Sequence, residues 1–256
     1  MNRAPIGFFD TGVGGLSVLR AAKELLPNED YVYLADLKNA PYGSKTEEEI
    51  LKLTTICVEQ LIEAGIKALV IACNTATSAA AKTLRKQFDM PIIGLEPAIK
   101  PAVETSKEGT PIIVMATPMT LHLEKYHRLA DDLHYEGLHD LPCKGLSRLI
   151  ETAGPGSKSI LAYLGDKLEP YKVYDKKSVV IGCTHFSFVS QDIKCVLGEA
   201  DTQIFDGRIG AAMQLKRILE QKDMLNDMGG QLKYISTDSE SYSDLHEFFM
   251  QIPIDQ

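Results

Sequence analysis

The sequence predicts an α/β protein built on parallel sheets. Two observations predict this fold class. Apolar runs of strand length alternate with longer segments of helical period along the chain, and one arrangement, a buried strand followed by a cysteine, occurs at both 69–75 and 179–185. Strands that alternate with helices form parallel sheets covered by helices on both faces. We therefore expect a ligand to bind beyond the carboxyl ends of the strands.

The first half of the chain follows this alternation. Residues 5–9 predict a strand, and the glycine-rich turn 12–15 leads into a helix at 16–26, which ends before Pro27 because proline cannot continue a helix. Further strands are expected at 31–35, 68–72 and 91–95, and further helices at 46–64 and 76–88. Residues 96–101 contain two prolines and are expected to interrupt the pattern.

The second half repeats the theme. The segments that continue it are 112–115, 121–132, 146–151, 159–168, 179–181 and 191–197, of which 121–132 and 159–168 are helix-like. A tail follows, with a strand at 203–205, a helix at 209–221, a polar loop at 226–230, a strand at 232–236 and a last helix. The two halves therefore resemble a weak internal repeat.

Composition narrows the class of partner. The 256 residues are 45% hydrophobic and 24% charged, which is typical of a globular protein, and Lys and Arg are outnumbered 27 to 35 by Asp and Glu. The net charge of -8 disfavours nucleic acid and anionic membranes as partners, so an anionic substrate needs local donors. Neither a signal peptide nor an apolar run of transmembrane length is present, and we expect a cytoplasmic protein.

The five cysteines are expected to stay reduced. Their odd number argues against a disulfide framework, and none has the C-x-x-C spacing of a zinc or redox motif. Cys57, Cys143 and Cys195 are interpreted as structural. His122, His127, His134 and His139 are irregularly spaced in a polar stretch, so we interpret them as surface residues and expect no metal site.

Cys73 and Cys183 are the strongest candidates for chemistry, because each follows a buried strand and opens the next segment. A helix N-terminus stabilises a thiolate, and we expect it to lower the thiol pKa from about 8.5. Asn74, Thr75 and Thr184 add hydrogen-bond donors that could hold a carboxylate.

Other polar residues lie at the same rim. Asp10 ends the first strand and His185 follows Cys183, so each could exchange protons with a thiol or hold an ammonium group. Asp36 and the loop 41–43 follow another parallel strand, on the same rim. The same residues are also consistent with an ordinary strand end and turn that has no role in binding. The turn 12–15 is a near miss to a dinucleotide fingerprint and supports cofactor binding only weakly.

Five segments together resemble the aspartate/glutamate racemase superfamily. They are 9–15, 41–43, 73–76, 96–98 and 182–185, in the family's order and at about its spacings. The resemblance implies two pseudo-symmetric α/β domains, each a mostly parallel sheet flanked by helices, with the active site in the cleft between them. It places residues 1–97 and 207–256 in the first domain and 98–206 in the second, and it suggests a homodimer.

The resemblance also implies an activity and a set of roles. It implies racemisation of L- and D-glutamate without a cofactor, to supply D-glutamate for peptidoglycan. Cys73 and Cys183 would be the two acid/base thiols, with Asp10 assisting Cys73, His185 assisting Cys183 and Glu151 orienting the histidine. The implied substrate contacts are Asp10, Thr11, Tyr42, Gly43, Asn74, Thr75, Thr184 and His185.

Physical chemistry agrees with two bases. Inverting a stereocentre requires removal of a proton from one face and delivery to the other, so a thiolate must face a thiol. No lysine lies in a recognisable pyridoxal phosphate motif, and we expect no cofactor. Two alternatives stay open: a racemase of aspartate or another acidic substrate, and a catalytically silent ligand-binding protein. A zinc or thiol hydrolase ranks below both.

Overall fold

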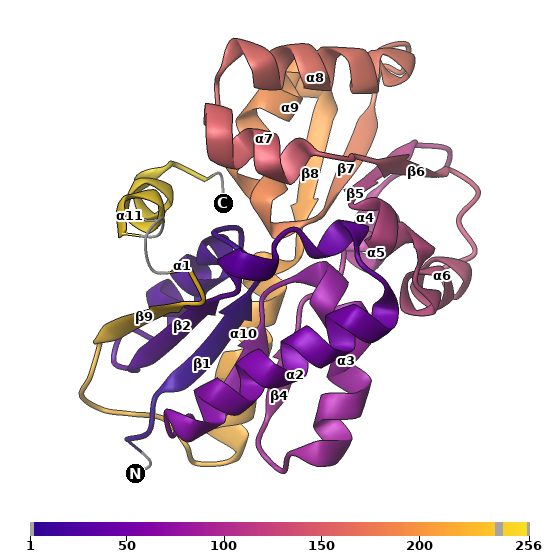
Figure 1. Cartoon of the computed structure of the whole chain (residues 1–256). Helices are drawn as coiled ribbons and strands as arrows, with labels where there is room; N and C mark the ends of the chain where they lie inside the picture. Colours follow the sequence, from indigo (N-terminus) through magenta and orange to yellow (C-terminus); the bar gives the residue numbers. More distant parts are fainter. Residues whose placement is uncertain (1–2, 239–242, 255–256) are drawn as a thin grey trace.

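The protein contains two parallel sheets, each flanked by helices (Figure 1). This architecture comes from a computed structural model, which describes residues 3–238 and 243–254. The predicted fold class is confirmed, and every strand pair in the described part of the chain is parallel. No helix within the described residues is long and apolar enough to cross a membrane.

The first sheet has five strands in the order β4-β3-β1-β2-β9. Its strands are β1 (Ile6–Asp10), β2 (Tyr31–Ala35), β3 (Ala68–Ile71), β4 (Ile92–Gly94) and β9 (Leu232–Ser236). The helical segments associated with it in the chain are α1 (Leu16–Leu25), η1 (Leu37–Asn39), η2 (Tyr42–Ser44), α2 (Glu47–Glu63), α3 (Asn74–Gln87), α10 (Gly207–Gln221) and α11 (Ser243–Gln251). The chain therefore returns to this sheet after completing the second one.

The second sheet has four strands in the order β6-β5-β7-β8. Its strands are β5 (Ile112–Ala116), β6 (Leu138–Pro142), β7 (Lys177–Gly182) and β8 (Thr202–Asp206). The helical segments are α4 (Ile99–Thr105), α5 (Pro118–His122), α6 (Glu124–Asp131), α7 (Leu146–Ala153), α8 (Lys158–Leu168), η3 (Glu169–Tyr171), η4 (Thr184–Val189), α9 (Ser190–Leu197) and η5 (Glu199–Asp201).

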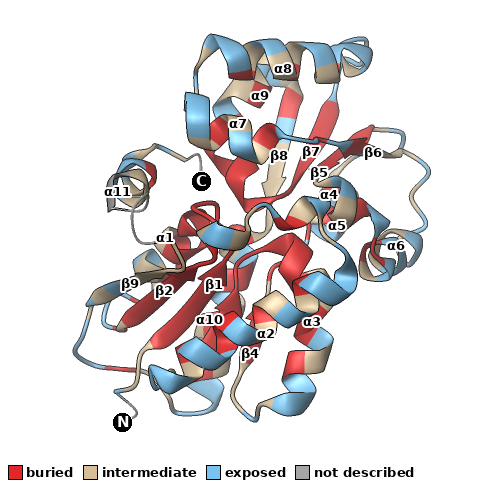
Figure 2. Cartoon of the chain, viewed as in Figure 1, coloured by how far each residue is buried: buried red, intermediate tan, exposed pale blue. Residues whose placement is uncertain are grey.

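Burial explains why these strands read as continuous apolar runs. β1, β2, β3, β5 and β7 are buried along their whole length (Figure 2). Strands covered on both faces need apolar side chains in both directions. Local signals set the helix ends: at the start of α2 the Thr46 side chain accepts from Glu49 N–H, and the Glu49 carboxylate accepts from Thr46 N–H.

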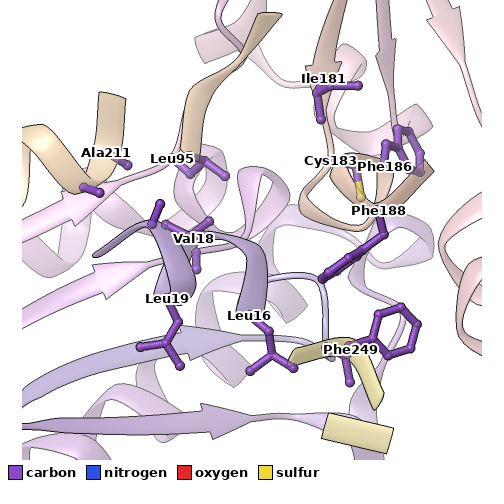
Figure 3. Packing of buried hydrophobic residues seen from close by; sticks show 14 of the residues in the cluster. Leu16, Val18, Leu19, Leu95, Ile181, Cys183, Phe186, Phe188, Ala211 and Phe249 are labelled. Carbon is purple, nitrogen blue, oxygen red and sulfur yellow. The ribbon is translucent and has the colours of Figure 1, made fainter. Parts of the chain in front are cut away.

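One hydrophobic cluster connects the two sheets. It includes Leu16 and Leu19 of α1 and Ala211 of α10 on one side, and Ile181 and Phe186 of the second sheet on the other (Figure 3). Burying apolar surface between the two sheets favours a defined arrangement of one against the other.

Three local expectations were wrong. Residues 96–101 do not stay irregular, because α4 begins at Ile99 and takes Pro101 into its first turn, where a missing N–H costs little. The expected helix 121–132 is split into α5 and α6 by Leu123, whose backbone is extended. Strand β6 was not predicted, and His139, expected at the surface, is half-buried on it, with its ring against Tyr171.

Candidate active site

A cavity of about 320 Å³ lies where the carboxyl ends of both sheets face each other. Parallel sheets place the ends of β1, β3 and β7 at their rims, which is where ligands of such sheets bind. The structure brings all the predicted site residues to this one cavity: Asp10, Thr11, Tyr42, Gly43, Cys73, Asn74, Thr75, Glu151, Cys183, Thr184 and His185. Residues far apart in the sequence thus form one polar chamber.

The two thiols enter the chamber from different sheets. Cys73 lies between β3 and α3, and Cys183 lies between β7 and η4. Each is 8% exposed, so each is held by its surroundings but still reachable from the cavity. The two thiols are also close enough to each other that a negative charge on Cys183 raises the pKa of Cys73.

The pKa of Cys73 differs from the sequence expectation. The Ala76 N–H does donate to its sulfur over 3.4 Å, as a helix N-terminus should. However, burial raises the pKa of Cys73, and the negative charge of Asp10 raises it further, so the value lies well above the ordinary thiol range. Cys73 is therefore held as a neutral thiol, which makes it a proton donor in this state.

Asp10 is a fully buried carboxyl group at the end of β1. Its Oδ2 accepts from the Gly15 N–H at 2.8 Å and from the Gly12 N–H at 3.3 Å. Burial raises the pKa of Asp10, and the positive charge of His185 and these N–H groups oppose that rise only in part. Its Oδ1 has no hydrogen-bond partner among the described residues, so one oxygen is available to a ligand.

Cys183, His185 and Glu151 form a hydrogen-bonded chain. The His185 Nδ1 lies 3.9 Å from the Cys183 sulfur, and its Nε2 lies 2.7 Å from Glu151 Oε1. Burial alone would lower the pKa of His185, but hydrogen bonds to Cys183 and Glu151 outweigh it and leave the pKa well above 6.5. The raised pKa favours the protonated imidazole, whose Nδ1 faces the Cys183 sulfur.

Glu151 keeps its negative charge in this chain. Burial raises the pKa of Glu151, but the hydrogen bond and charge of His185 and the Val13 N–H together hold it below the ordinary value. The carboxylate thereby fixes which nitrogen of His185 faces the sulfur. This contact connects α7 to η4 within the second sheet's half of the cleft.

The glycine turn 12–15 has a steric role that its sequence did not reveal. A Cβ at Gly14 would lie 2.4 Å from both His185 Nδ1 and Thr184 Oγ1, and a Cβ at Gly12 would lie 2.7 Å from Glu151 Oε1. These approaches leave no room for a side chain at either position. The turn therefore serves as a close-fitting wall for the histidine rather than as a nucleotide loop.

Hydroxyl groups from both sheets meet at one side of the cavity. Thr75 Oγ1 lies 3.1 Å from Thr117 Oγ1 and 2.9 Å from Thr120 Oγ1. Beside them Asn74 is buried, and neither its Nδ2 nor its Oδ1 has a hydrogen-bond partner among the described residues. An unpaired buried amide is costly unless a ligand completes it. This side of the cavity is thus suited to a carboxylate.

Tyr42 lines the cavity with its hydroxyl directed to the protein. Its OH donates to Asp36 Oδ2 over 2.6 Å. Asp36 Oδ1 accepts from Asn39 Nδ2 and from Thr237 Oγ1, so the buried carboxyl group holds the loop 37–42 in place. Asp36 does not line the cavity itself and acts through Tyr42.

Some cavity residues were not among the predicted site residues: Leu37, Ala40, Thr117, Ser147, Arg148 and Thr152. Pro41 also lines the cavity and belongs to the loop 41–43, which the sequence placed at this rim. Thr117 could have been found, because it directly follows the strand β5 and so lies on the same rim. Arg148 and its neighbours lie on α7 and carry no such signal.

The three remaining cysteines lie outside the cavity. Cys57 and Cys143 are buried, whereas Cys195, interpreted as structural, is exposed on α9. No group of three or more His, Cys, Asp or Glu side chains that could hold a metal ion occurs within the described residues. A larger hollow of about 760 Å³ lies along the edge strand β8 and is lined by neither Cys73 nor Cys183.

Comparisons with known proteins agree with this geometry. The family model described as Asp/Glu/Hydantoin racemase matches residues 15–214. The chain is 49% identical over 246 residues to a glutamate racemase of Clostridium novyi, covering 93% of this chain and 92% of that one.

Solved structures show the same arrangement. Glutamate racemase from Francisella tularensis in complex with D-glutamate superposes with a TM-score of 0.85 at 25% identity, over 100% of this chain and 96% of that one. The Escherichia coli glutamate racemase, in complex with L-glutamate and an activator, has a TM-score of 0.83 at 28% identity, over 95% and 92%.

Proposed function

The chain belongs to the Asp/Glu/hydantoin racemase family, and from this premise we propose that it interconverts L- and D-glutamate. One observation carries the proposal: two thiols from two different sheets line one cavity, each beside a different charged partner. A racemase needs this pairing, because a proton leaves one face of Cα and another arrives at the opposite face. A ligand-binding protein would have no use for two thiols placed in this way.

The unequal surroundings of the thiols assign the first step. Cys183, next to the imidazolium of His185, is the base that removes the Cα proton of the enantiomer whose Cα–H faces it. Cys73, kept protonated by burial and by Asp10, donates its proton to the opposite face. The products are the other enantiomer, a thiol at Cys183 and a thiolate at Cys73. The reverse reaction then runs from that protonation state.

The cavity must also stabilise the carbanion. A Cα–H beside a carboxylate is a weaker acid than a thiol by on the order of ten pKa units, or roughly 14 kcal/mol at about 1.4 kcal/mol per unit. Donors that strengthen their hydrogen bonds as charge moves onto the α-carboxylate reduce this cost. Asn74, Thr75 and Thr184 are placed to be these donors, and the free Oδ1 of Asp10 is placed to accept from the ammonium group.

The identity of the substrate rests on the relatives. The related enzyme from Clostridium novyi is named glutamate racemase, and the matched structures hold D-glutamate or L-glutamate. We assign this chain the same substrate, and we propose that its D-glutamate serves peptidoglycan synthesis. The mechanism uses only side chains of the protein, so it needs no cofactor.

Solvent isotope incorporation tests the activity. Pure L-glutamate and pure D-glutamate are incubated with the enzyme in D₂O, and deuterium at Cα is followed by mass spectrometry together with optical rotation. We expect label in the newly formed enantiomer from either starting material. L- and D-aspartate are tested in parallel, and label confined to aspartate would assign the enzyme to the alternative substrate.

Variants of the thiols test the mechanism. Cys73→Ala and Cys183→Ala should each lower the racemisation rate by at least about 10³-fold, because each removes one of two obligatory proton carriers. Cys195→Ala is the matched control, since its thiol is exposed and lies outside the cavity, and it should retain full activity. Normal racemisation by either single cavity variant would refute the two-thiol mechanism.

Two further parts of the proposal, the homodimer and the domain boundaries, rest on the family resemblance, and the cytoplasmic location continues the expectation from the sequence. We assign a homodimer and a cytoplasmic location, and we place the domain boundaries at 97/98 and 206/207. Sedimentation velocity tests the dimer, fractionation of the source cells tests the location, and limited proteolysis tests the boundaries.

A further inference from the structure

A buried serine on the catalytic loop connects it to the crossing between the two sheets. Ser187 lies on η4, two residues after His185, and is 1% exposed. Its Oγ donates to Asp206 Oδ2 over 2.6 Å. Asp206 is the last residue of β8 and the N-cap of α10, so this one bond joins the loop to the point where the chain returns to the first sheet.

The acceptor of this bond is itself held firmly. The Arg208 guanidinium donates to Asp206 Oδ2 over 2.6 Å, and the Arg208 backbone N–H donates to Asp206 Oδ1 over 2.9 Å. The two side chains are 8% and 11% exposed, so solvent screens the ion pair little. A charged, immobilised acceptor gives Ser187 a fixed anchor rather than a mobile surface contact.

The anchor lies at a crowded point of the fold. A Cβ at Gly207 would lie 2.5 Å from the Glu96 carbonyl oxygen, so the two chain segments that pass between the sheets touch here. Beyond Gly207, α10 packs against α1, the helix that follows the Asp10 turn. The position of Asp206 is thus set by the half of the molecule that contains the first sheet. The Ser187 hydroxyl that it binds lies on the catalytic loop of the other half.

The rest of η4 cannot supply this connection. Phe186 and Phe188, on either side of Ser187, are buried in the apolar cluster, where Phe188 packs against Phe249 (Figure 3). Apolar contacts of this kind are nondirectional and tolerate small shifts. A hydrogen bond to a charged group is directional and fixes a distance. Ser187 provides such a bond from this segment to Asp206 at the crossing.

We infer that Ser187 is a positioning residue for the reaction: through Asp206 it fixes η4, and so holds His185 against Cys183. This inference rests on the proposed function for its catalytic consequence. The His185–Cys183 contact is already long at 3.9 Å, so a small shift of η4 carries it beyond hydrogen-bond range. Loss of the Ser187 hydroxyl should therefore weaken the assistance to one thiol and leave the other unaffected.

The test compares two thiols within the same cavity. In Ser187→Ala, the alkylation rates of Cys183 and Cys73 by iodoacetamide are measured by peptide mapping, without substrate. We expect the ratio of the Cys183 rate to the Cys73 rate to fall about threefold or more, because the Cys183 sulfur loses part of its contact with the His185 imidazole, a neighbour that promotes thiol reactivity. In the racemase assay kcat should fall about tenfold with KM little changed.

The matched control is Ser190→Ala. Ser190 is also a buried serine at the end of the same segment, but its Oγ donates to the Ser187 carbonyl over 2.8 Å and not to Asp206. It should leave the alkylation ratio unchanged. Asp206→Asn tests the link from its other end and should lower the ratio in the same direction as Ser187→Ala. Ser187→Ala should still fold, because Arg208 continues to pair with Asp206.

Three results would overturn the inference. They are an unchanged ratio in Ser187→Ala, an equal fall in Ser190→Ala, and faster alkylation of the buried Cys57 and Cys143 together with both cavity thiols, which would indicate general loosening. The alkylation ratio is measured without glutamate, so the inference about Ser187 can be refuted even when the wild-type enzyme racemises glutamate. Conversely, a wild-type enzyme without racemase activity would refute the proposed function. The alkylation ratio would then still report whether Ser187 positions His185 beside Cys183.

Discussion

The Glu151 carboxylate lies 2.7 Å from His185 Nε2, and this contact holds a charged imidazole beside the Cys183 sulfur. Each partner stabilises the charged form of the other. The pKa of Glu151 is lowered from 4.5, and that of His185 is raised from 6.5, as expected for an ion pair protected from solvent. The same contact therefore serves both the stability of the fold and the chemistry of the thiol.

Glu151→Gln should lower stability within a defined pH window. Glu151 has a lowered pKa, so its contribution is complete above pH 4.5 and is lost as the pH falls through the folded value. His185 has a raised pKa, so its contribution is complete below pH 6.5 and is lost as the pH rises through the folded value. The difference in free energy of unfolding between wild type and variant should be largest from pH 4.5 to 6.5, at about 2 kcal/mol, and thermal unfolding measures it as a difference in Tm.

Glu124→Gln is the control for this prediction. It removes a surface carboxylate that pairs with Arg128, where both side chains are more than half exposed. Exposed pairs contribute little. Its Tm should therefore follow that of the wild type across the pH range. A Glu151→Gln difference that stayed constant from pH 4 to pH 9 would contradict the coupling.

Gly14→Ala should damage catalysis through sterics alone. The new methyl group would lie 2.4 Å from both His185 Nδ1 and Thr184 Oγ1, so the imidazole that faces Cys183 must be displaced. Misplacement of a catalytic group by about 1 Å can cost about 100-fold, and we expect kcat to fall by that order. Gly165→Ala is the control, because that position on α8 has open space around it. Unchanged kcat in Gly14→Ala would show that the histidine position is not critical.

Asn74→Ala should separate stability from binding. Both polar atoms of this buried amide lack partners among the described residues, so its removal should leave Tm unchanged or raise it. If Asn74 holds the substrate carboxylate, KM should rise about tenfold or more, the equivalent of about 1.4 kcal/mol. Steady-state kinetics and thermal unfolding check the two effects.

Asn226→Ala is the matched control for Asn74. Its side-chain amide is also buried and unpartnered among the described residues, but it lies outside the cavity. Its removal should change Tm in the same direction and leave KM unaltered. Equal effects of both variants on KM would argue that Asn74 does not contact the substrate.

The fold and most of the site were predictable because they depend on local patterns. The strands 31–35 and 232–236 were predicted at their observed bounds. The first is a buried parallel strand, which reads as a compact apolar run, whereas the second is a partly buried edge strand whose apolar residues no histidine or carboxylate interrupts. Cys73, Cys183 and Asp10 were found because each lies at, or just beyond, the carboxyl end of a buried strand. β6 was missed because it is an edge strand, in which only Leu141 is buried and His139 and Asp140 interrupt the apolar run.

Tertiary contacts explain what the sequence could not predict. The raised pKa of Cys73 reverses the local effect of its helix, because burial and Asp10 outweigh one N–H group. The tight fit of Gly14 against His185 joins residues from opposite halves of the chain, and no local pattern reports it. Distances between residues on the two sides of a cleft depend on how the two halves pack, so only the structure provides them.

Arg148 offers a test of how an acidic protein attracts an acidic substrate. Among the described residues that line the cavity, it alone carries a permanent positive charge, and it is exposed on α7. Its charge contributes to lowering the pKa of Glu151, which places it near the mouth of the site. A cation at the mouth raises the local concentration of an anionic substrate, and salt screens this effect.

Arg148→Gln should raise KM about threefold at low ionic strength and leave kcat little changed, because the side chain acts on approach rather than on proton transfer. The difference from wild type should shrink as salt is raised towards about 0.5 M, where the screening length falls well below 10 Å. Arg128→Gln removes an equally exposed charge from α6, outside the cavity, and should leave KM unchanged at any salt concentration. A fall in kcat that persists in high salt would instead place Arg148 among the groups that contact the reacting substrate.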